Sequence, residues 1–265
     1  MSVAIGVDVG ATKIAAARVD LERGAILDAR RRPTAAGRGP EAVLSECRAL
    51  AEELREDRVA VGLAVCELVG PGGQVRSAET VDWRGVDLLA TFDSVESDVR
   101  AAALAEARFG AGRKQPDFLY VSVGSGISHC LIAGGEPRVG VRGSAIGTGA
   151  PLVERWSGGL ALARRTGHAS AEEALADPAA AGVVDDAARR LGVVLAALVN
   201  ALDPGAVIFG GSLGLHDRYR ARVEAALRRA VYDPDARALP VLPAGLGADA
   251  PVIGAALVAA RSART

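Results

Sequence analysis

The chain has 265 residues, a formal net charge of −1, and a composition that is 50% hydrophobic and 24% charged. This balance is typical of a folded globular protein and argues against a nucleic-acid-binding protein, whose basic residues gather in patches. Three isolated cysteines, Cys47, Cys66 and Cys130, predict a reducing environment and no zinc-ligand spacing. The sequence lacks a signal-like N-terminus and an apolar run of membrane-spanning length, so we expect a cytoplasmic protein with no membrane partner.

The first hundred residues alternate strand and helix patterns. Apolar, β-branched runs predict strands at Val3–Val9, Lys13–Asp20 and Ala25–Arg32, then an amphipathic helix over 41–56 and a buried strand over 59–68. An Ala-rich helix begins after Ser97 or Asp98, both of which are good N-cap residues. Strand, helix and strand in this order predict an α/β layer.

The remaining residues repeat the pattern with longer helices. Strands are expected at 117–123, 129–133, 206–209 and 239–246, and helices at 160–166, 171–176, 181–202 and 250–264. The long helix ends at Asp203-Pro204-Gly205, where proline and glycine are typical of a helix end.

The turn after the first strand carries the most informative motif. Asp8 lies at the end of a buried strand, where a carboxylate is costly unless something pairs with it. Gly10 lets the backbone turn or approach a ligand closely, and Thr12 adds a hydroxyl beside Lys13. Backbone N–H groups in such a turn can hold an anion. The pattern suits a phosphate-binding hairpin, and an ordinary hairpin with a turn aspartate is the alternative.

Two further glycine turns follow predicted strands. Gly124-Ser125-Gly126 follows the strand over 117–123, and Gly210-Gly211 follows the strand over 206–209. Each is a weak signal alone, because glycine turns after strands are common.

In this order the motifs resemble the ROK family (repressor, open reading frame, kinase) of the actin-like sugar-kinase superfamily. The resemblance implies an α/β, two-lobed actin-like ATPase (ribonuclease H-like) fold with a nucleotide cleft between the lobes. We expect an N-terminal lobe over 1–97, a C-terminal lobe over 98–250 and a closing helix over 251–265 that packs back on the first lobe. The resemblance also implies a sugar kinase that uses ATP and Mg²⁺.

The resemblance assigns roles to individual residues. Asp98 is the expected catalytic base, and Ser97 replaces an asparagine that binds sugar in the family. Glu154 is the other expected substrate-binding residue. Asp8 is expected to hold Mg²⁺ through water, and the expected ATP-binding residues are Gly10, Thr12, Lys13, Gly124, Ser125, Gly126, Gly210 and Gly211, with Asp8. A simpler role for Asp98, as a helix cap, is compatible with catalysis.

One segment departs from the family pattern. Gly147 stands where the family has a glutamate and Ala150 where it has a histidine, two residues that contact sugar hydroxyls. The family's zinc-binding cysteine cluster is missing, so we expect no zinc site. The expected substrate is a sugar or sugar-like polyol, with an amino sugar or a cyclitol as alternatives, and a non-catalytic ligand-binding protein as an alternative of another class. A homodimer is implied by resemblance only.

Overall fold

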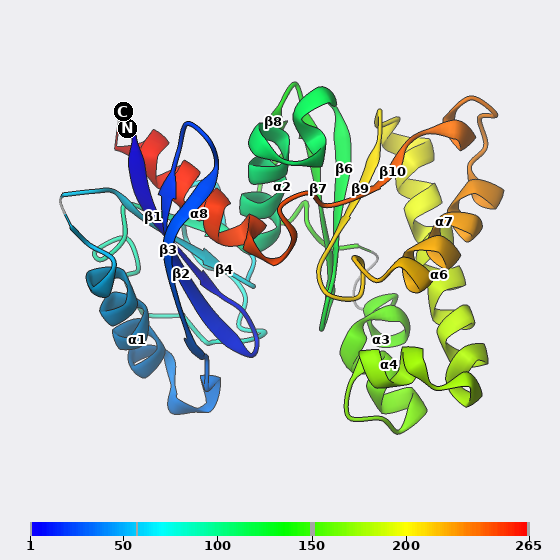
Figure 1. The fold of residues 1–265 in the computed structure, drawn as a ribbon, viewed down its shortest axis with the longest axis horizontal. Helices are drawn as coiled ribbons and strands as arrows, with labels where there is room; N and C mark the ends of the chain where they lie inside the picture. The colour runs from blue at the N-terminus through cyan, green and yellow to red at the C-terminus, as the bar shows by residue number, and fades with distance from the viewer. Residues whose placement is uncertain (1, 57, 149–151, 264–265) are drawn as a thin grey trace. The chain divides into compact units, whose positions relative to one another are not determined.

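A computed structural model describes residues 2–56, 58–148 and 152–263. The chain forms two compact units (Figure 1). Unit 1 comprises residues 1–110, 136–146 and 249–265, and unit 2 comprises residues 111–135 and 147–248. This division differs from the expected lobes of 1–97 and 98–250, because the helix after residue 97 packs within unit 1, against the helix that follows residue 249.

Unit 1 is built on a mixed five-stranded sheet. Its strands are β1 (Val3–Val9), β2 (Lys13–Asp20), β3 (Ala25–Pro33), β4 (Val61–Val65) and β5 (Ser94–Ser97), in the order β3-β2-β1-β4-β5. The first three strands form an antiparallel meander, whereas β4 and β5 continue from β1 in parallel. Sequence patterning predicts the meander but places no separate strand at β5, whose four residues are too short to show a period of two.

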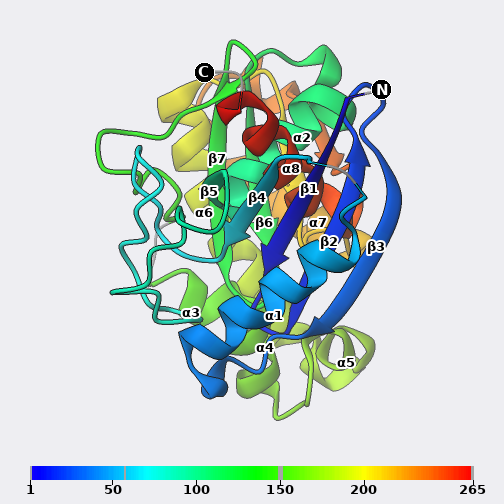
Figure 2. The ribbon, with the colours of Figure 1, turned by 90° about the vertical axis from the view of Figure 1, so that its left-hand side faces the viewer.

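The two faces of this sheet bury different helices. Side chains alternate along a strand, and the odd-numbered Ile5, Val7 and Val9 of β1 join one core with α1 (Pro40–Glu53). Figure 2 shows α1 in front of β1 and β2. Even-numbered positions face α8 (Ala250–Ser262), where Ala64 of β4 and Ala255 share a small cluster with Ala101 of α2 (Asp98–Phe109).

Helix α8 lies unusually close to the sheet because glycine occupies the contact positions. A Cβ atom on Gly6 would lie 1.9 Å from the Val252 carbonyl oxygen, and one on Gly62 would lie 2.1 Å from that of Ala255. Helix α8 reaches α2 in the same way, since a Cβ on Gly254 would lie 1.9 Å from the Ala101 oxygen. These close approaches fix the position of α2, and therefore of its first residue, Asp98, relative to β1.

Unit 2 packs helices against a second sheet. Its strands are β6 (Phe118–Val123), β7 (Ile127–Ala133), β9 (Val207–Gly210) and β10 (Val241–Pro243), and its helices are α3 (Glu154–Ser157), α4 (Gly159–Thr166), α5 (Ala171–Ala176), α6 (Ala181–Leu202) and α7 (Asp217–Ala230). The strands run in the order β10-β9-β6-β7, with β6 parallel to β9 and antiparallel to β7. The two-residue strand β8 (Glu136–Pro137) follows where the chain returns to unit 1.

The core of unit 2 joins α6 and α7 to the sheet. Leu191 and Leu195 of α6 pack with Val223 and Leu227 of α7. The predicted α/β class is confirmed; β1 and β2 have the expected bounds, and the bounds of the other predicted strands differ by up to three residues. No helix in the described part of the chain is both long and apolar enough to span a bilayer.

Candidate functional site

The carboxyl ends of three neighbouring parallel strands bring polar residues together in unit 1. The register pairs Asp8 of β1 with Ala64 of β4, and Val65 with Ser97 of β5. Asp8 therefore lies near the end of β1, Cys66 comes directly after β4, and Asp98 comes directly after β5. The carboxyl ends of parallel strands are the usual ligand-binding edge of an α/β sheet.

Asp8 is a carboxylate without a protein partner. Its side chain is half-buried overall, but its Oδ1 atom is fully enclosed and has no hydrogen-bond partner among the described residues. The pKa of Asp8 is raised from 3.8 to about 8, chiefly by burial and then by the negative charge of Asp98, while the positive charge of Lys13 opposes the rise. A carboxylate in this state is unsatisfied until a cation or a proton reaches it.

Asp98 is the first residue of α2, and Ser97 occupies the N-cap position without a side-chain capping bond. The Asp98 Oδ1 atom accepts a 2.6 Å hydrogen bond from the Val99 N–H, and Oδ2 accepts one from the Cys66 thiol at 3.2 Å. Burial raises the pKa of Asp98, and these two hydrogen bonds lower it. The carboxylate is partly exposed, so each of its oxygens can still accept a bond from a ligand hydroxyl.

Ser97 differs from Asp98 in accessibility. It is completely buried, and its hydroxyl oxygen has no partner within the described chain. A substrate could contact the Ser97 side chain only if the residues that cover it moved. The expected substrate-binding role of Ser97 therefore stays a prediction.

The turn between β1 and β2 is held by its own backbone and by Thr34. Gly10 N–H donates to the Lys13 carbonyl at 3.0 Å, and Thr34 donates its hydroxyl to the Gly10 carbonyl at 2.6 Å. The Thr34 N–H also donates to the Thr12 carbonyl. The Thr12 and Lys13 side chains are left exposed beside Asp8, as an anion-binding turn requires.

Sequence patterning does not single out Glu67 as a structural residue, because it places Glu67 inside the strand over 59–68. The residue is buried, and its carboxylate accepts hydrogen bonds from the N–H groups of Glu79, Thr80 and Val81 and from the Ser77 hydroxyl. Glu67 therefore organises the loop after β4, next to Cys66. An acidic residue at the end of an apolar run is the signal that marks it.

Arg100 is the other residue that the sequence did not reveal. Its guanidinium is buried, forms an ion pair with Glu96, and donates to the carbonyl oxygens of Val69 at 2.6 Å and Gly143 at 2.9 Å. The side chain thus ties α2, β5, the loop after β4 and the segment over 136–146 together within unit 1. An arginine directly before the Ala-rich run of α2 was its only signal.

In unit 2 the hairpin between β6 and β7 is braced by the start of α4. Gly124 N–H donates to the Gly126 carbonyl at 3.0 Å, while the N–H groups of Gly159 and Leu160 donate to the carbonyls of Gly124 and Ser125. A Cβ atom on Gly124 would have no described atom within 4 Å. Internal packing therefore leaves the space over Gly124 open, which fits the close approach of a ligand.

The glycine pair after β9 has a different physical basis. A Cβ on Gly210 would lie 2.0 Å from the Tyr120 hydroxyl, and one on Gly211 would lie 2.4 Å from the Val123 carbonyl oxygen. Gly211 also has a φ of 76°, which non-glycine residues adopt only under strain. The packing of unit 2 thus requires both glycines by itself, and an adenosine-binding role stays a prediction.

Glu154 lies against the hairpin of unit 2. Its carboxylate accepts a long 3.5 Å hydrogen bond from the Ile127 N–H, and it lies 3.0 Å from where a Cβ on Gly126 would be. The contact orders the hairpin, and the expected bond to a substrate hydroxyl remains a prediction.

The segment that departs from the family pattern pairs with β7. Gly147 forms an isolated antiparallel bridge with Ser128, and the Thr148 hydroxyl lies 2.9 Å from His129 Nδ1. Burial lowers the pKa of His129, which keeps this buried pair uncharged at neutral pH. Ala150, expected at the family histidine position, falls outside the described residues.

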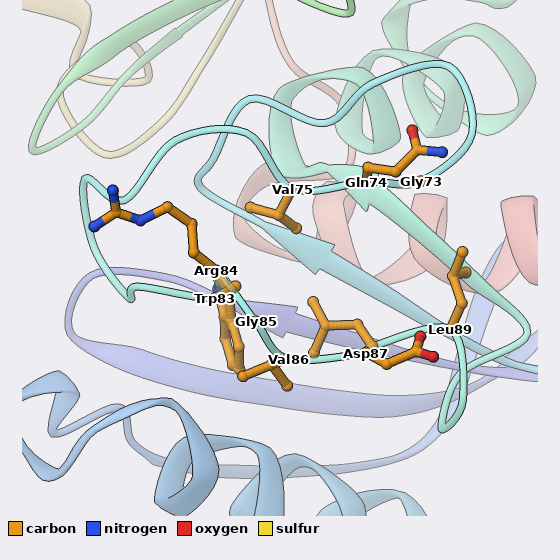
Figure 3. Close-up of a pocket in the computed structure, with 10 residues that line it drawn as sticks. Gly73, Gln74, Val75, Trp83, Arg84, Gly85, Val86, Asp87 and Leu89 are labelled. Carbon is orange, nitrogen blue, oxygen red and sulfur yellow. The ribbon is translucent and has the colours of Figure 1, made fainter.

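A cavity in unit 1 lies apart from these clusters. Its volume is about 180 Å³, and it lies between the 73–75 turn and residues 83–89. Figure 3 shows the residues that line it. Its Trp83 is buried in the α1 core, and none of the predicted site residues lines the cavity. Among the described residues there is no group of three histidine, cysteine or acidic side chains that could hold a metal ion.

The sequence is similar to those of known sugar kinases. The glucokinase of Streptomyces coelicolor is 30% identical over 265 residues, covering 80% of this chain and 83% of that protein. The bifunctional enzyme NanE/NanK of Brucella melitensis is 35% identical over 186 residues, covering 63% of this chain. The chain spans about a third of the length of that longer relative, 35%.

Solved structures share the fold over almost the whole chain. A ROK family glucokinase from Streptomyces griseus, in complex with glucose and AMPPNP, has a TM-score of 0.82 and 27% identity, covering 98% of this chain and 100% of that one. A ROK hexokinase from Thermus thermophilus has a TM-score of 0.77 and 29% identity, with 99% of both chains covered. The ROK family pattern itself matches residues 4–156 and 152–262, and the chain belongs to the ROK family.

Proposed function

We propose that the chain is an ATP-dependent kinase that phosphorylates a hydroxyl group of a sugar or sugar-like polyol. The observation that carries the proposal is the juxtaposition of Asp8 and Asp98 at the carboxyl ends of parallel strands in a member of the ROK family. The glucokinase and N-acetylmannosamine kinase names of full-length relatives support the reaction class.

In this reaction Asp98 is the catalytic base. Its carboxylate accepts a hydrogen bond from the acceptor hydroxyl and takes the proton as the hydroxyl oxygen forms a bond to the γ-phosphorus of ATP. The bond between that phosphorus and its bridging oxygen breaks, and ADP leaves with the electron pair. Because phosphoryl transfer has a loose transition state, orientation of the hydroxyl contributes more than basicity.

Asp8 fits the expected magnesium site. Its enclosed, unpartnered Oδ1 is a hard oxygen ligand, and magnesium is usually held in proteins by one or two carboxylates together with water and phosphate oxygens. When bound, Mg²⁺ would neutralise charge on the phosphates. The contribution of unit 1 is the Asp8 carboxylate, which would give up its proton when the ion binds, and the exposed Thr12 and Lys13 of the turn after β1, which we propose as a phosphate contact.

Two alternatives remain within the same fold. An amino sugar is one alternative acceptor, because the N-acetylmannosamine kinase of Escherichia coli O127:H6 is 28% identical over 96% of this chain and 97% of that protein. Gly147, without a side chain to bond a hydroxyl, is also consistent with an acceptor other than glucose, including a cyclitol. A ligand-binding protein without turnover is the alternative of another class.

Turnover of a panel of acceptors tests the proposal. We expect ADP release to depend on one or more hexoses, N-acetylhexosamines or cyclitols in the presence of ATP and Mg²⁺. Asp98→Asn keeps an acceptor for the Val99 N–H but removes the base, and should lower kcat by at least about a hundredfold with an unchanged melting temperature.

Asp233→Asn is the matched control, because exposed Asp233 also accepts one backbone N–H, from Asp235. It should leave turnover unchanged. ATP binding without acceptor-dependent ADP release on the whole panel would favour the non-catalytic alternative. Turnover of Asp98→Asn within a few-fold of wild type would remove Asp98 from the mechanism.

A further inference from the structure

Cys66 occupies a position that the proposed mechanism does not use. It comes directly after β4, between the end of β1 and the start of α2, and its thiol donates to Asp98 Oδ2 at 3.2 Å. Its neighbour Glu67 is anchored by hydrogen bonds from the N–H groups over residues 79–81, so the backbone at Cys66 is held in place. The contact with Asp98 is therefore made by a fixed donor.

We propose that Cys66 is a positioning residue for Asp98: its thiol bond holds one carboxylate oxygen and orients the other lone pairs toward the acceptor hydroxyl. The proposal rests on the kinase function proposed above. The Val99 N–H alone fixes Oδ1 but allows the carboxylate to turn about that bond, and the thiol removes this freedom at Oδ2. Orientation of a reacting group within a fraction of an ångström is a recognised source of rate enhancement.

The surroundings of Cys66 favour a donor over a nucleophile. Burial raises the pKa of the thiol well above its usual range, and the charges of Asp98 and Asp8 raise it further. A thiol that stays protonated is slow to react with oxidants and electrophiles, but it keeps its proton available for hydrogen bonding. A sulfur donor is also weaker than a hydroxyl or an amide, so it positions the carboxylate without greatly reducing its basicity.

Three substitutions at Cys66 separate hydrogen bonding from packing. Cys66→Ala removes the donor and volume, Cys66→Val removes the donor but keeps volume, and Cys66→Ser keeps a donor. Loss of this weak thiol hydrogen bond predicts a fall in kcat of about two- to tenfold for the alanine and valine variants, with the KM for ATP unchanged. The serine variant should recover most of the wild-type kcat, and Cys130→Ala, at a buried thiol of β7, should leave it unaltered.

An infrared measurement tests the contact without relying on turnover. The S–H stretching band of Cys66, identified by difference from Cys66→Ala, should lie at the lower frequency of a hydrogen-bonded thiol and move to higher frequency in Asp98→Ala. If the frequency of the band is unchanged in Asp98→Ala, the proposal is wrong. A Cys66→Val variant with wild-type kcat would also overturn it. If no acceptor is turned over, the proposed function and the positioning of a base fail together, and the infrared band still shows whether the thiol bonds Asp98.

Discussion

Asp8→Asn should make unit 1 more stable at neutral pH while it removes activity. The folded carboxyl has a pKa of about 8 against 3.8 in its ordinary state. Between pH 4 and pH 7 the unfolded group is ionised while the folded one stays mostly protonated. About three pH units at about 1.4 kcal/mol each give a destabilisation of about 4 kcal/mol at pH 7. Asparagine does not titrate, so the variant lacks this destabilisation.

The direction of the pKa shift of Asp8 determines how stability depends on pH. Because the pKa of this acid is raised on folding, the folded state binds more protons, and wild-type stability should fall from about pH 4 to about pH 8. The variant should not show this fall. In the control Asp20→Asn, stability relative to wild type should fall with rising pH. The hydrogen bond from Arg23 lowers the pKa of Asp20, so the ionised carboxylate contributes stability above about pH 4, and asparagine removes this contribution.

Hydrogen exchange of the β1 and β4 amides reports on the stability of the unit 1 sheet itself. The ratio of protection factors, variant over wild type at the same pH, should rise steeply between pH 5 and pH 8. Turnover with ATP and Mg²⁺ should fall by about 10²- to 10³-fold in Asp8→Asn. A protection ratio equal at the two pH values would refute the burial of an unpartnered carboxylate at this position.

Four other predictions concern different features of the protein. Gly124→Val should weaken ATP binding at least about tenfold in calorimetry without changing the melting temperature, since its side chain meets open space. Gly211→Ala should lower stability by about 1–3 kcal/mol, because the positive φ strains alanine and its Cβ would clash with the Val123 backbone. Equal ATP affinity in folded Gly124→Val would place the nucleotide elsewhere. Arg100→Met should cost about 3–5 kcal/mol by leaving Glu96 and two carbonyls unpaired, and a melting curve like that of wild type would contradict this. Elemental analysis of the purified protein should find no stoichiometric zinc, and about one ion per chain surviving chelation would contradict the prediction.

The elements that the sequence predicted are those with strong local patterns. The β1–β2 hairpin follows from an apolar run, a glycine turn and a second apolar run, and its strands have the predicted bounds. Strand β5 was missed because four residues beside an Ala-rich helix carry little periodicity. Boundaries of the compact units could not be read either, since the packing of α2 on α8 depends on a contact between residues far apart in sequence, Ala101 and Gly254.

The candidate site was predicted unevenly for similar reasons. Asp8 and Asp98 stood out because a carboxylate at the end of a buried strand or the start of a helix conflicts with its surroundings. Cys66 did not, because a cysteine next to an apolar strand is equally suited to a core. The pair Gly210-Gly211 was only a weak signal in the sequence, and the packing reason for Gly211, the nearby Val123 backbone, emerges only from the structure.

The close seating of α8 on β1 and β4 also sets an order of events during synthesis. Unit 1 is discontinuous in sequence. Residues 147–248, which belong to unit 2, therefore leave the ribosome before α8 does. Until then Gly6 and Gly62 leave a groove along the sheet with nothing to fill it, and α2 lacks the helix that fixes it. Residues 147–248 of unit 2 can therefore fold first. Unit 1 remains an incomplete intermediate until α8 emerges, with the apolar face of its sheet that α8 covers still exposed. Nascent chains of this protein should need protection from aggregation on the side of the sheet that α8 later covers.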